Sequence, residues 1–125
     1  MKTRSYEFRE ECYNVSIILV WPVDAPALCA FLKKRLPDAD ITDICDGEEE
    51  FAGWCSIYDK HHVIALGHWD NGVIDTSILS HECIHCALHI LLERSIEINE
   101  DNHEPLAYLQ DSLLRRCLTV LRAKR

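Results

Sequence analysis

One stretch decides how the rest of the chain is interpreted: Leu79-Ser80-His81-Glu82-Cys83-Ile84-His85-Cys86-Ala87. If this stretch is helical, residues four apart lie on one face, so the imidazoles of His81 and His85 can bind the same metal ion. Glu82 then lies about 100° further round the helix, beside the metal and not on it. A zinc hydrolase needs two neutral nitrogen ligands and a neighbouring carboxylate, and HExxH is the motif that supplies them.

The same pattern has a simpler explanation, an amphipathic helix that carries two surface or core histidines. The residues within and around the motif argue against it, because Cys83, Ile84, Cys86 and Ala87 are all uncharged. A later segment also offers a further ligand, as described below. We therefore predict a metal site with Zn²⁺ as its ion.

Length and composition indicate a single domain over residues 1–125 that is large enough for a modest core. The hydrophobic content of 48% and the charged content of 27% are ordinary for a globular protein. The net charge of −8 argues against a general nucleic-acid or membrane-surface binder, which would normally carry a basic face. We expect neither nucleic acid nor membrane as a partner, and the sequence does not indicate an oligomeric state.

The cysteines predict free thiols. There are 7 of them, an odd number, and their spacing shows no disulfide framework. Cys83 and Cys86 flank His85 and are interpreted as reduced, packed thiols. No signal peptide, transit peptide or transmembrane run is visible, so the predicted location is cytoplasmic, in the bacterial host if the protein is phage-encoded.

The first half of the chain predicts one or two strands and a helix. Residues 1–12 form a frayed arm or an edge strand, and residues 13–21 a buried strand that ends at Pro22. Asp24 can cap a helix that carries Pro26 in its first turn and runs to about Leu36. Residues 39–50 mix a short apolar run with an acidic cluster, for which a solvated loop is the preferred interpretation.

The second half predicts a hairpin followed by two helices. Two strand-like runs, residues 51–58 and 62–69, are joined by a turn at residues 59–61. A central helix starts near Asp75 or Thr76 and runs to about Arg94, and a last helix, capped by Asn102, runs to about Ala123. The predicted fold class is α+β: a minimal zincin-like domain with a small, mostly antiparallel sheet, an active-site helix and a following C-terminal helix.

A catalytic zinc site needs a third protein ligand besides the two histidines. Glu104 is the best candidate, because a short loop between the helices would let the first turn of the last helix fold back over the His81/His85 face. His103 competes with it, since imidazole is also a good zinc ligand. Glu100 and Asp101 are further alternatives.

Residues that follow Glu104 at helical spacing suggest supporting roles, each with an ordinary amphipathic helix as the alternative. Tyr108 could donate a hydrogen bond to an oxyanion in the tetrahedral intermediate. Asp111 could accept a hydrogen bond from a ligand imidazole and fix its tautomer. His68 could line the cleft, whereas His89 would lie about 6 Å further along the helix axis, out of reach of the same metal ion.

With these residues in hand, the chain resembles the gluzincins, zinc peptidases with HExxH on one helix and a glutamate ligand on the next. More closely, residues 81–87 followed by residues 102–109 look like a family of small metallopeptidase-like proteins of tailed bacteriophages and prophages. The resemblance implies His81, His85 and Glu104 as ligands and Glu82 as base, and it brings no substrate. One departure is Tyr108, because the thermolysin-like pattern has an aspartate four residues after the glutamate ligand.

A second resemblance is to the peptide deformylases, whose corresponding stretch is similar to residues 81–85 and which use an upstream cysteine as third ligand. The segment Ile44-Cys45-Asp46-Gly47 lacks the sequence context of that family. The preferred prediction is thus a zinc-dependent hydrolase, most simply a peptidase acting on a protein or peptide held along a strand edge at residues 62–69. The alternative is a non-catalytic, zincin-like module that binds a host or phage protein, with zinc as a structural clip.

Overall fold

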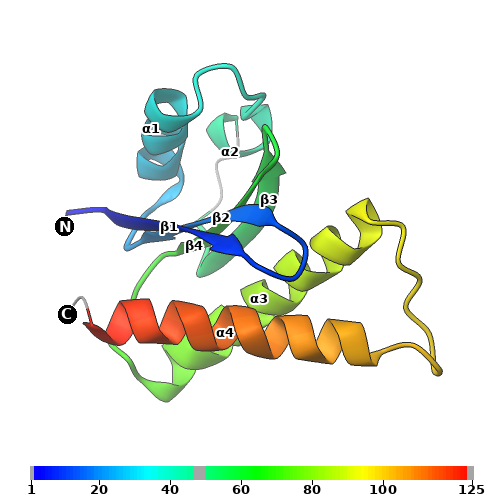
Figure 1. Ribbon diagram of the computed structural model, residues 1–125. Helices are drawn as coiled ribbons and strands as arrows, with labels where there is room; N and C mark the ends of the chain where they lie inside the picture. The colour runs from blue at the N-terminus through cyan, green and yellow to red at the C-terminus, as the bar shows by residue number, and fades with distance from the viewer. Residues whose placement is uncertain (1, 47–49, 124–125) are drawn as a thin grey trace.

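The computed structural model describes residues 2–46 and 50–123 as four strands and four helices (Figure 1). Glu48 and Glu49 of the acidic cluster lie outside the described residues. The elements, in chain order, are β1 (Arg4–Glu10), β2 (Val15–Trp21), α1 (Ala25–Arg35), α2 (Thr42–Cys45), β3 (Gly53–Tyr58), β4 (His61–Leu66), α3 (Val73–Glu93) and α4 (Glu104–Ala123). The α+β class is therefore confirmed.

The four strands form one sheet in the order β1-β2-β4-β3. The pairs β1–β2 and β3–β4 are antiparallel, and the central pair β2–β4 is parallel. The sheet is thus mostly antiparallel, as predicted. The connection between the parallel strands β2 and β4 runs through α1, α2 and β3, because parallel neighbours need a long connection.

Helices cover both faces of the sheet, with α1 and α2 on one side and α3 and α4 on the other (Figure 1). Alternate residues of β2 serve the two layers, since Ile17 and Leu19 pack with α3 and α4 whereas Ile18 and Val20 pack with α1. All four are completely buried. Because both faces of β2 are buried, its sequence is a continuous apolar run and does not alternate between apolar and polar residues.

The prediction that residues 62–69 form the exposed edge of the sheet is wrong. The observed strand β4 is an inner strand, whose main chain is paired with β2 on one side and with β3 on the other. Its apolar residues Val63, Ile64 and Ala65 are accordingly fully buried. The strand at this edge of the sheet is β3, which pairs with β4 on one side and with no described strand on the other.

Element boundaries follow the local signals closely. The carboxylate of Asp24 accepts a hydrogen bond from the backbone nitrogen of Ala27, 2.9 Å away, and so caps α1 as predicted. Asp59 and Lys60 both have positive φ, of 48° and 70°, which is the conformation of a tight hairpin turn. Helix α3 begins at Val73, slightly before the predicted start near Asp75 or Thr76, and its N-cap is Gly72.

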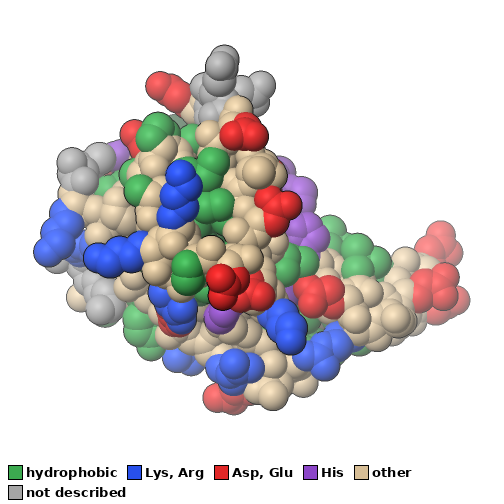
Figure 2. Space-filling view, turned by 90° about the horizontal axis from the view of Figure 1, so that it is seen from above, with side chains coloured by type: hydrophobic (Ala, Val, Ile, Leu, Met, Phe, Trp, Pro, Cys, Tyr) green, Lys and Arg blue, Asp and Glu red, His purple; other side chains and the backbone are tan. Residues whose placement is uncertain are grey.

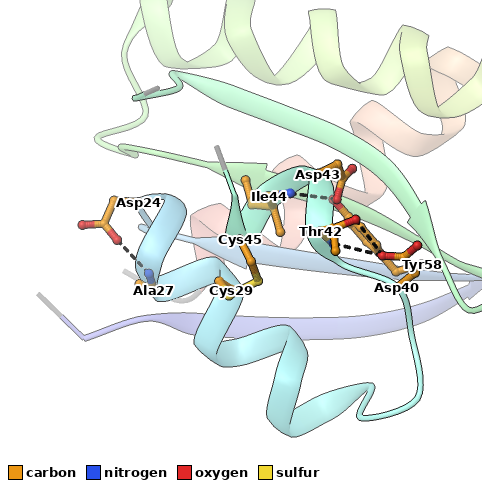
Figure 3. Close-up of a disulfide and its surroundings, with 9 residues drawn as sticks. All are labelled: Asp24, Ala27, Cys29, Asp40, Thr42, Asp43, Ile44, Cys45 and Tyr58. Atoms are coloured by element: carbon orange, nitrogen blue, oxygen red, sulfur yellow. Dashed lines mark hydrogen bonds between the residues drawn. A yellow bond between two sulfur atoms is a disulfide. The ribbon is translucent and has the colours of Figure 1, made fainter. Parts of the chain in front are cut away.

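The prediction of free thiols is wrong for two of the seven cysteines. Cys29 in α1 and Cys45 in α2 form a disulfide with an S–S distance of 2.02 Å (Figure 3). Sequence spacing gave no hint of the pair, because the two helices meet only when both pack on the same face of the sheet. Cys83 and Cys86 are free and buried, as predicted. The disulfide also removes Cys45 as a deformylase-type metal ligand.

Two further features concern the surroundings of the protein. Within the described residues, no helix is both long enough and apolar enough to span a membrane. Acidic side chains gather at the projecting end of the molecule, where the connection between α3 and α4 lies (Figure 2). The cytoplasmic location stays a prediction, and a disulfide is uncommon in that compartment.

The disulfide should contribute measurably to stability. It closes a loop with a sequence separation of 16. A cross-link that closes a loop of this length restricts the conformations of the unfolded chain and so raises its free energy by about 3 kcal/mol. Replacing Cys29 and Cys45 together by Ser should therefore lower the free energy of unfolding by about that amount in urea denaturation. Replacing Cys12, an exposed free cysteine, by Ser is the matched control and should change little. Equal stability of all three proteins would contradict a formed disulfide.

Candidate metal and acid–base site

Helix α3 presents two different faces at the motif. One face is apolar and lies in the core, where Leu79, Cys83 and Ile90 have no exposed surface. His81 and His85 are both exposed. Since burial of the apolar face fixes the rotation of the helix, the histidine pair is directed away from the core without any interaction of its own.

The two histidines lie in a geometry that suits one metal ion. Their Nε2 atoms are 3.1 Å apart, and the rings meet edge to face with centroids 4.7 Å apart. Two nitrogens bound to a tetrahedral zinc at about 2.05 Å would be about 3.3 Å from each other. The pair thus needs only a small adjustment to hold zinc, so the residues fit the predicted metal.

Glu82 is buried beside the histidine pair, with only 7% of its surface exposed. A glycine makes room for it: a Cβ added at Gly53 on β3 would come within 2.8 Å of Oε2 and Cγ of Glu82. Burial raises the pKa of the Glu82 carboxyl, and the charges on His81 and His85 oppose that shift without cancelling it. Glu82 therefore has the position and the raised pKa of a general base.

The structure does not bring the predicted third ligand into this pair. Within the described residues, no His, Cys, Asp or Glu joins His81 and His85 in a group whose ligand atoms all lie within 4.8 Å of one another. Glu104 is exposed at the start of α4, where it lines a groove of about 280 Å³ together with Cys12 and Tyr13. The Glu104 and His103 assignments stay predictions.

The other predicted residues on α4 lie on its exposed side. Tyr108 is 68% exposed and lines the same groove as Glu104. Asp111 is exposed and accepts a hydrogen bond from Nη2 of Arg115, 2.9 Å away, in an ordinary surface ion pair. The proposed contact of Asp111 with a ligand imidazole is absent among the hydrogen bonds of the described residues. Two residues of α4 do reach this part of α3: Gln110, whose Nε2 donates to Oγ of Ser80 over 3.0 Å, and Cys117, whose thiol lies in hydrogen-bond contact with that of Cys83.

A second group of possible metal ligands lies at the start of α3. The ligand atoms of His68, Asp70 and Asp75 all lie within 4.8 Å of one another, so the cluster could hold a metal ion. Nδ1 of His68 is 3.0 Å from Oδ2 of Asp75. The same oxygen accepts a hydrogen bond of 2.6 Å from the backbone nitrogen of Asp70. Asp75 is 7% exposed, so its charge is compensated by these contacts and by the adjacent helix N-terminus.

A third polar contact joins β3 to α3 one helical turn beyond the motif. Sγ of Cys55 lies 4.0 Å from Nδ1 of His89. A hydrogen bond from Cys86 and the proximity of His89 lower the pKa of the Cys55 thiol to about 7. His89 is thus a partner of a thiol and not part of the His81/His85 pair, which agrees with the expectation that one metal ion would be out of its reach.

Several polar residues of α3 lie along one side of the helix, a pattern that was not identified from the sequence. Asp75, Glu82 and His89 recur every seven residues, so they follow the same side of α3. Glu93 continues the row, and its Oε1 lies 3.1 Å from Nε2 of the fully buried His62. A seven-residue repeat of ionisable residues inside an apolar helix was the available signal. It indicates a side of the helix that meets a sheet edge instead of the core.

Comparison of the chain with family models, with curated proteins and with solved structures found no match in any of the three.

The burial of Glu82 predicts a stability change when its charge is removed. The folded state binds a proton at Glu82 more tightly than the unfolded state, because the pKa is raised above 4.5. Stability is therefore lost as the pH rises from the ordinary pKa through the raised one. In metal-free protein, Glu82→Gln should be more stable than the wild type at neutral pH and equal to it below about pH 4. Urea denaturation across this range measures the difference.

The control is Glu97→Gln, which alters an exposed carboxylate in the α3–α4 connection and should leave stability unchanged at every pH. A Glu82→Gln variant that is less stable than the wild type at neutral pH would contradict the burial of an uncompensated carboxylate.

Proposed function

We propose that this protein is a zinc-dependent hydrolase that cleaves peptide bonds. The observation that carries the proposal is the separation of 3.1 Å between Nε2 of His81 and Nε2 of His85, on a helix that buries a glutamate between them. Zinc held there would act as a Lewis acid, which activates water and polarises a carbonyl group. Among the described residues, His81 and His85 have no further ligand atom grouped with them, so a zinc ion held there would keep coordination positions for water and substrate.

Glu82 is the residue to which we assign proton transfer. Its carboxylate would take the proton of the attacking water and later hand it to the leaving amine. The raised pKa favours both steps, because the group must be ionised to accept the proton and must hold it long enough to deliver it. Gly53 supports this role, since any larger side chain there would displace the Glu82 carboxylate.

The β3 edge is the part of the fold that suits a peptide substrate. Gly53, the first residue of β3, lies against the side chain of Glu82, so this edge of the sheet is close to Glu82. The side of β3 that faces away from β4 pairs with no strand of the described residues. An extended peptide could add to this edge through main-chain hydrogen bonds, with its scissile bond beside Glu82.

Two residues of α4 complete the proposal. Glu104 is proposed as the third zinc ligand and Tyr108 as a donor to the oxyanion. Both side chains are exposed, and both lie on the first two turns of a helix that packs against α3. Their approach to the histidine pair would have to accompany binding of metal or substrate.

Replacing Glu82 by Gln tests the catalytic claim. The substitution keeps the shape and hydrogen bonding of the side chain and removes the base. Zinc should bind with unchanged stoichiometry, while the rate of peptide hydrolysis should fall on the order of 10²–10⁴-fold. Zinc content by atomic absorption and cleavage of a fluorogenic peptide library measure the two quantities. A variant that cleaves as fast as the wild type would remove Glu82 from the mechanism.

The ligand claim has a separate test on two neighbouring residues. Glu104→Ala should weaken zinc binding, since a protein ligand is lost, whereas His103→Ala should leave zinc affinity nearly unchanged. Competition with a chromophoric chelator gives the two affinities. The reverse ranking would transfer the third position to His103.

The alternative function is a non-catalytic module that binds another protein, with zinc as a clip. One observation favours it: large apolar side chains are exposed on the helix that carries the histidines, including Ile74 and Leu92. The two functions differ in their dependence on Glu82. A binding module would keep its partner affinity in Glu82→Gln, whereas a hydrolase would lose its activity.

A further inference from the structure

The exposed side of α3 carries a regular stripe of six residues. They are Ile74, Ile78, His81, His85, Leu88 and Leu92. The spacings alternate between four and three, which is the heptad pattern of a helix that packs against another helix. At about 100° per residue the stripe stays within about 80° of arc along the whole helix.

Four of these six residues are free to meet a partner. Ile74 is 76% exposed and Leu92 is 64% exposed, and both histidines are exposed as well. Leu88 is half-buried, and so is Ile78, which also packs against the core beside Gly53 of β3. The charged side chains of α3 lie elsewhere, since Glu82 meets Gly53 and Glu93 meets His62 on the sheet side of the helix. An apolar stripe without charges is typical of the centre of an interface.

The stripe is symmetric about its midpoint at Cys83. His81 and His85 lie two residues on either side of it, and Ile78 and Leu88 lie five residues away. Ile74 and Leu92 lie nine residues away. Such a pattern is self-complementary, because an antiparallel copy of the same helix would set each residue opposite its symmetry mate. Antiparallel packing also sets the partly positive N-terminus of each helix beside the partly negative C-terminus of the other, which is favourable.

The two histidines of the stripe also favour a second copy of this chain as the partner. In one chain, His81 and His85 have no third described ligand within reach, although their Nε2 atoms are 3.1 Å apart. Two antiparallel copies would bring four imidazole nitrogens to the two-fold axis, which is a full tetrahedral shell for zinc. We infer that α3 is the interface of a zinc-bridged homodimer, in which His81 and His85 of two copies of this chain hold one ion.

The size of the stripe indicates that the metal is required. A stable homodimer usually buries about 800 Å² on each partner, contributed by about 20–30 residues. Six residues on one helix face fall well short of this, so apolar contact alone would leave the chain monomeric. Zinc binding supplies the free energy of association that the apolar contact lacks. The fraction of dimer therefore rises with the zinc concentration.

This inference rests on the metal-binding part of the proposed function, because it uses the same two histidines, and it adds regulation to it. Four imidazoles leave no coordination position for water, so the paired form cannot hydrolyse a peptide. The dimer is then a resting form, and hydrolysis belongs to the monomer that binds zinc with an open position.

Sedimentation velocity on the full chain tests the dimer directly. Metal-free protein should sediment as a monomer of 14.5 kDa. Addition of zinc chloride should convert it to twice that mass with one zinc for two chains, and excess EDTA should reverse the change. His81→Ala and His85→Ala should each abolish the conversion, whereas His103→Ala should preserve it.

Charge substitutions at the ends of the stripe test its register. Ile74→Lys combined with Leu92→Lys would set like charges opposite each other and should keep the protein monomeric with zinc present. Ile74→Lys combined with Leu92→Glu would set opposite charges together and should restore the dimer. Val73→Lys is the matched control, because that side chain is 87% exposed on α3 but lies outside the stripe. It should dimerise like the wild type.

The outcomes separate this inference from the proposed function. One zinc per monomer, with affinity that depends on Glu104 and with peptide cleavage, would overturn the dimer and leave the hydrolase standing. A zinc-bridged dimer that cleaves no peptide under dissociating conditions would support the dimer and sink the hydrolase. A dimer that forms without zinc, or that survives loss of His81, would also overturn the inference, and so would the absence of zinc binding.

Discussion

Burial of the apolar face of α3 against the sheet is the interaction on which the rest of this structure depends. Leu79, Cys83 and Ile90 have no exposed surface, in a core to which β2, β4 and α4 also contribute. At about 25 cal/mol per Å² such burial fixes the rotation of the helix far more strongly than any polar contact on it. Once the rotation is fixed, every other residue of α3 has a defined direction, and the helix carries three separate chemistries on its three remaining sides.

The sides differ in what they meet. The row of Asp75, Glu82 and His89 faces the β3 side, where a glycine, a thiol and a short loop accommodate it. The side with Ser80 meets Gln110 of α4. In the stripe with the two histidines, Ile78 packs against the core beside Gly53, whereas Ile74, His81, His85 and Leu92 are exposed, which leaves a metal pair and apolar side chains on the same exposed side. Hydrolysis and self-association would therefore draw on the same residues, and the concentrations of zinc and protein would decide between them.

Glu82 shows how strongly one small residue can set the chemistry of a neighbour. A carboxylate that is 7% exposed is costly unless something compensates it. The compensation comes from His81 and His85, whose charges lower the pKa, and it is smaller than the effect of burial. Gly53 permits this arrangement by leaving out a side chain. The burial of the Glu82 carboxylate is thus only partly compensated.

The sequence by itself determined the local features of this protein, because each rests on residues close together in the chain. The cap at Asp24, the hairpin turn at Asp59 and the helical pairing of His81 with His85 all follow from spacing and side-chain chemistry. Only the tertiary structure decided which strand forms the edge, which cysteines bond and which residues approach the histidines. Those outcomes depend on how helices and strands pack. Cys29 and Cys45, like Gly53 and Glu82, are far apart in the sequence and come into contact only in the folded chain, so no local sequence pattern predicts these contacts.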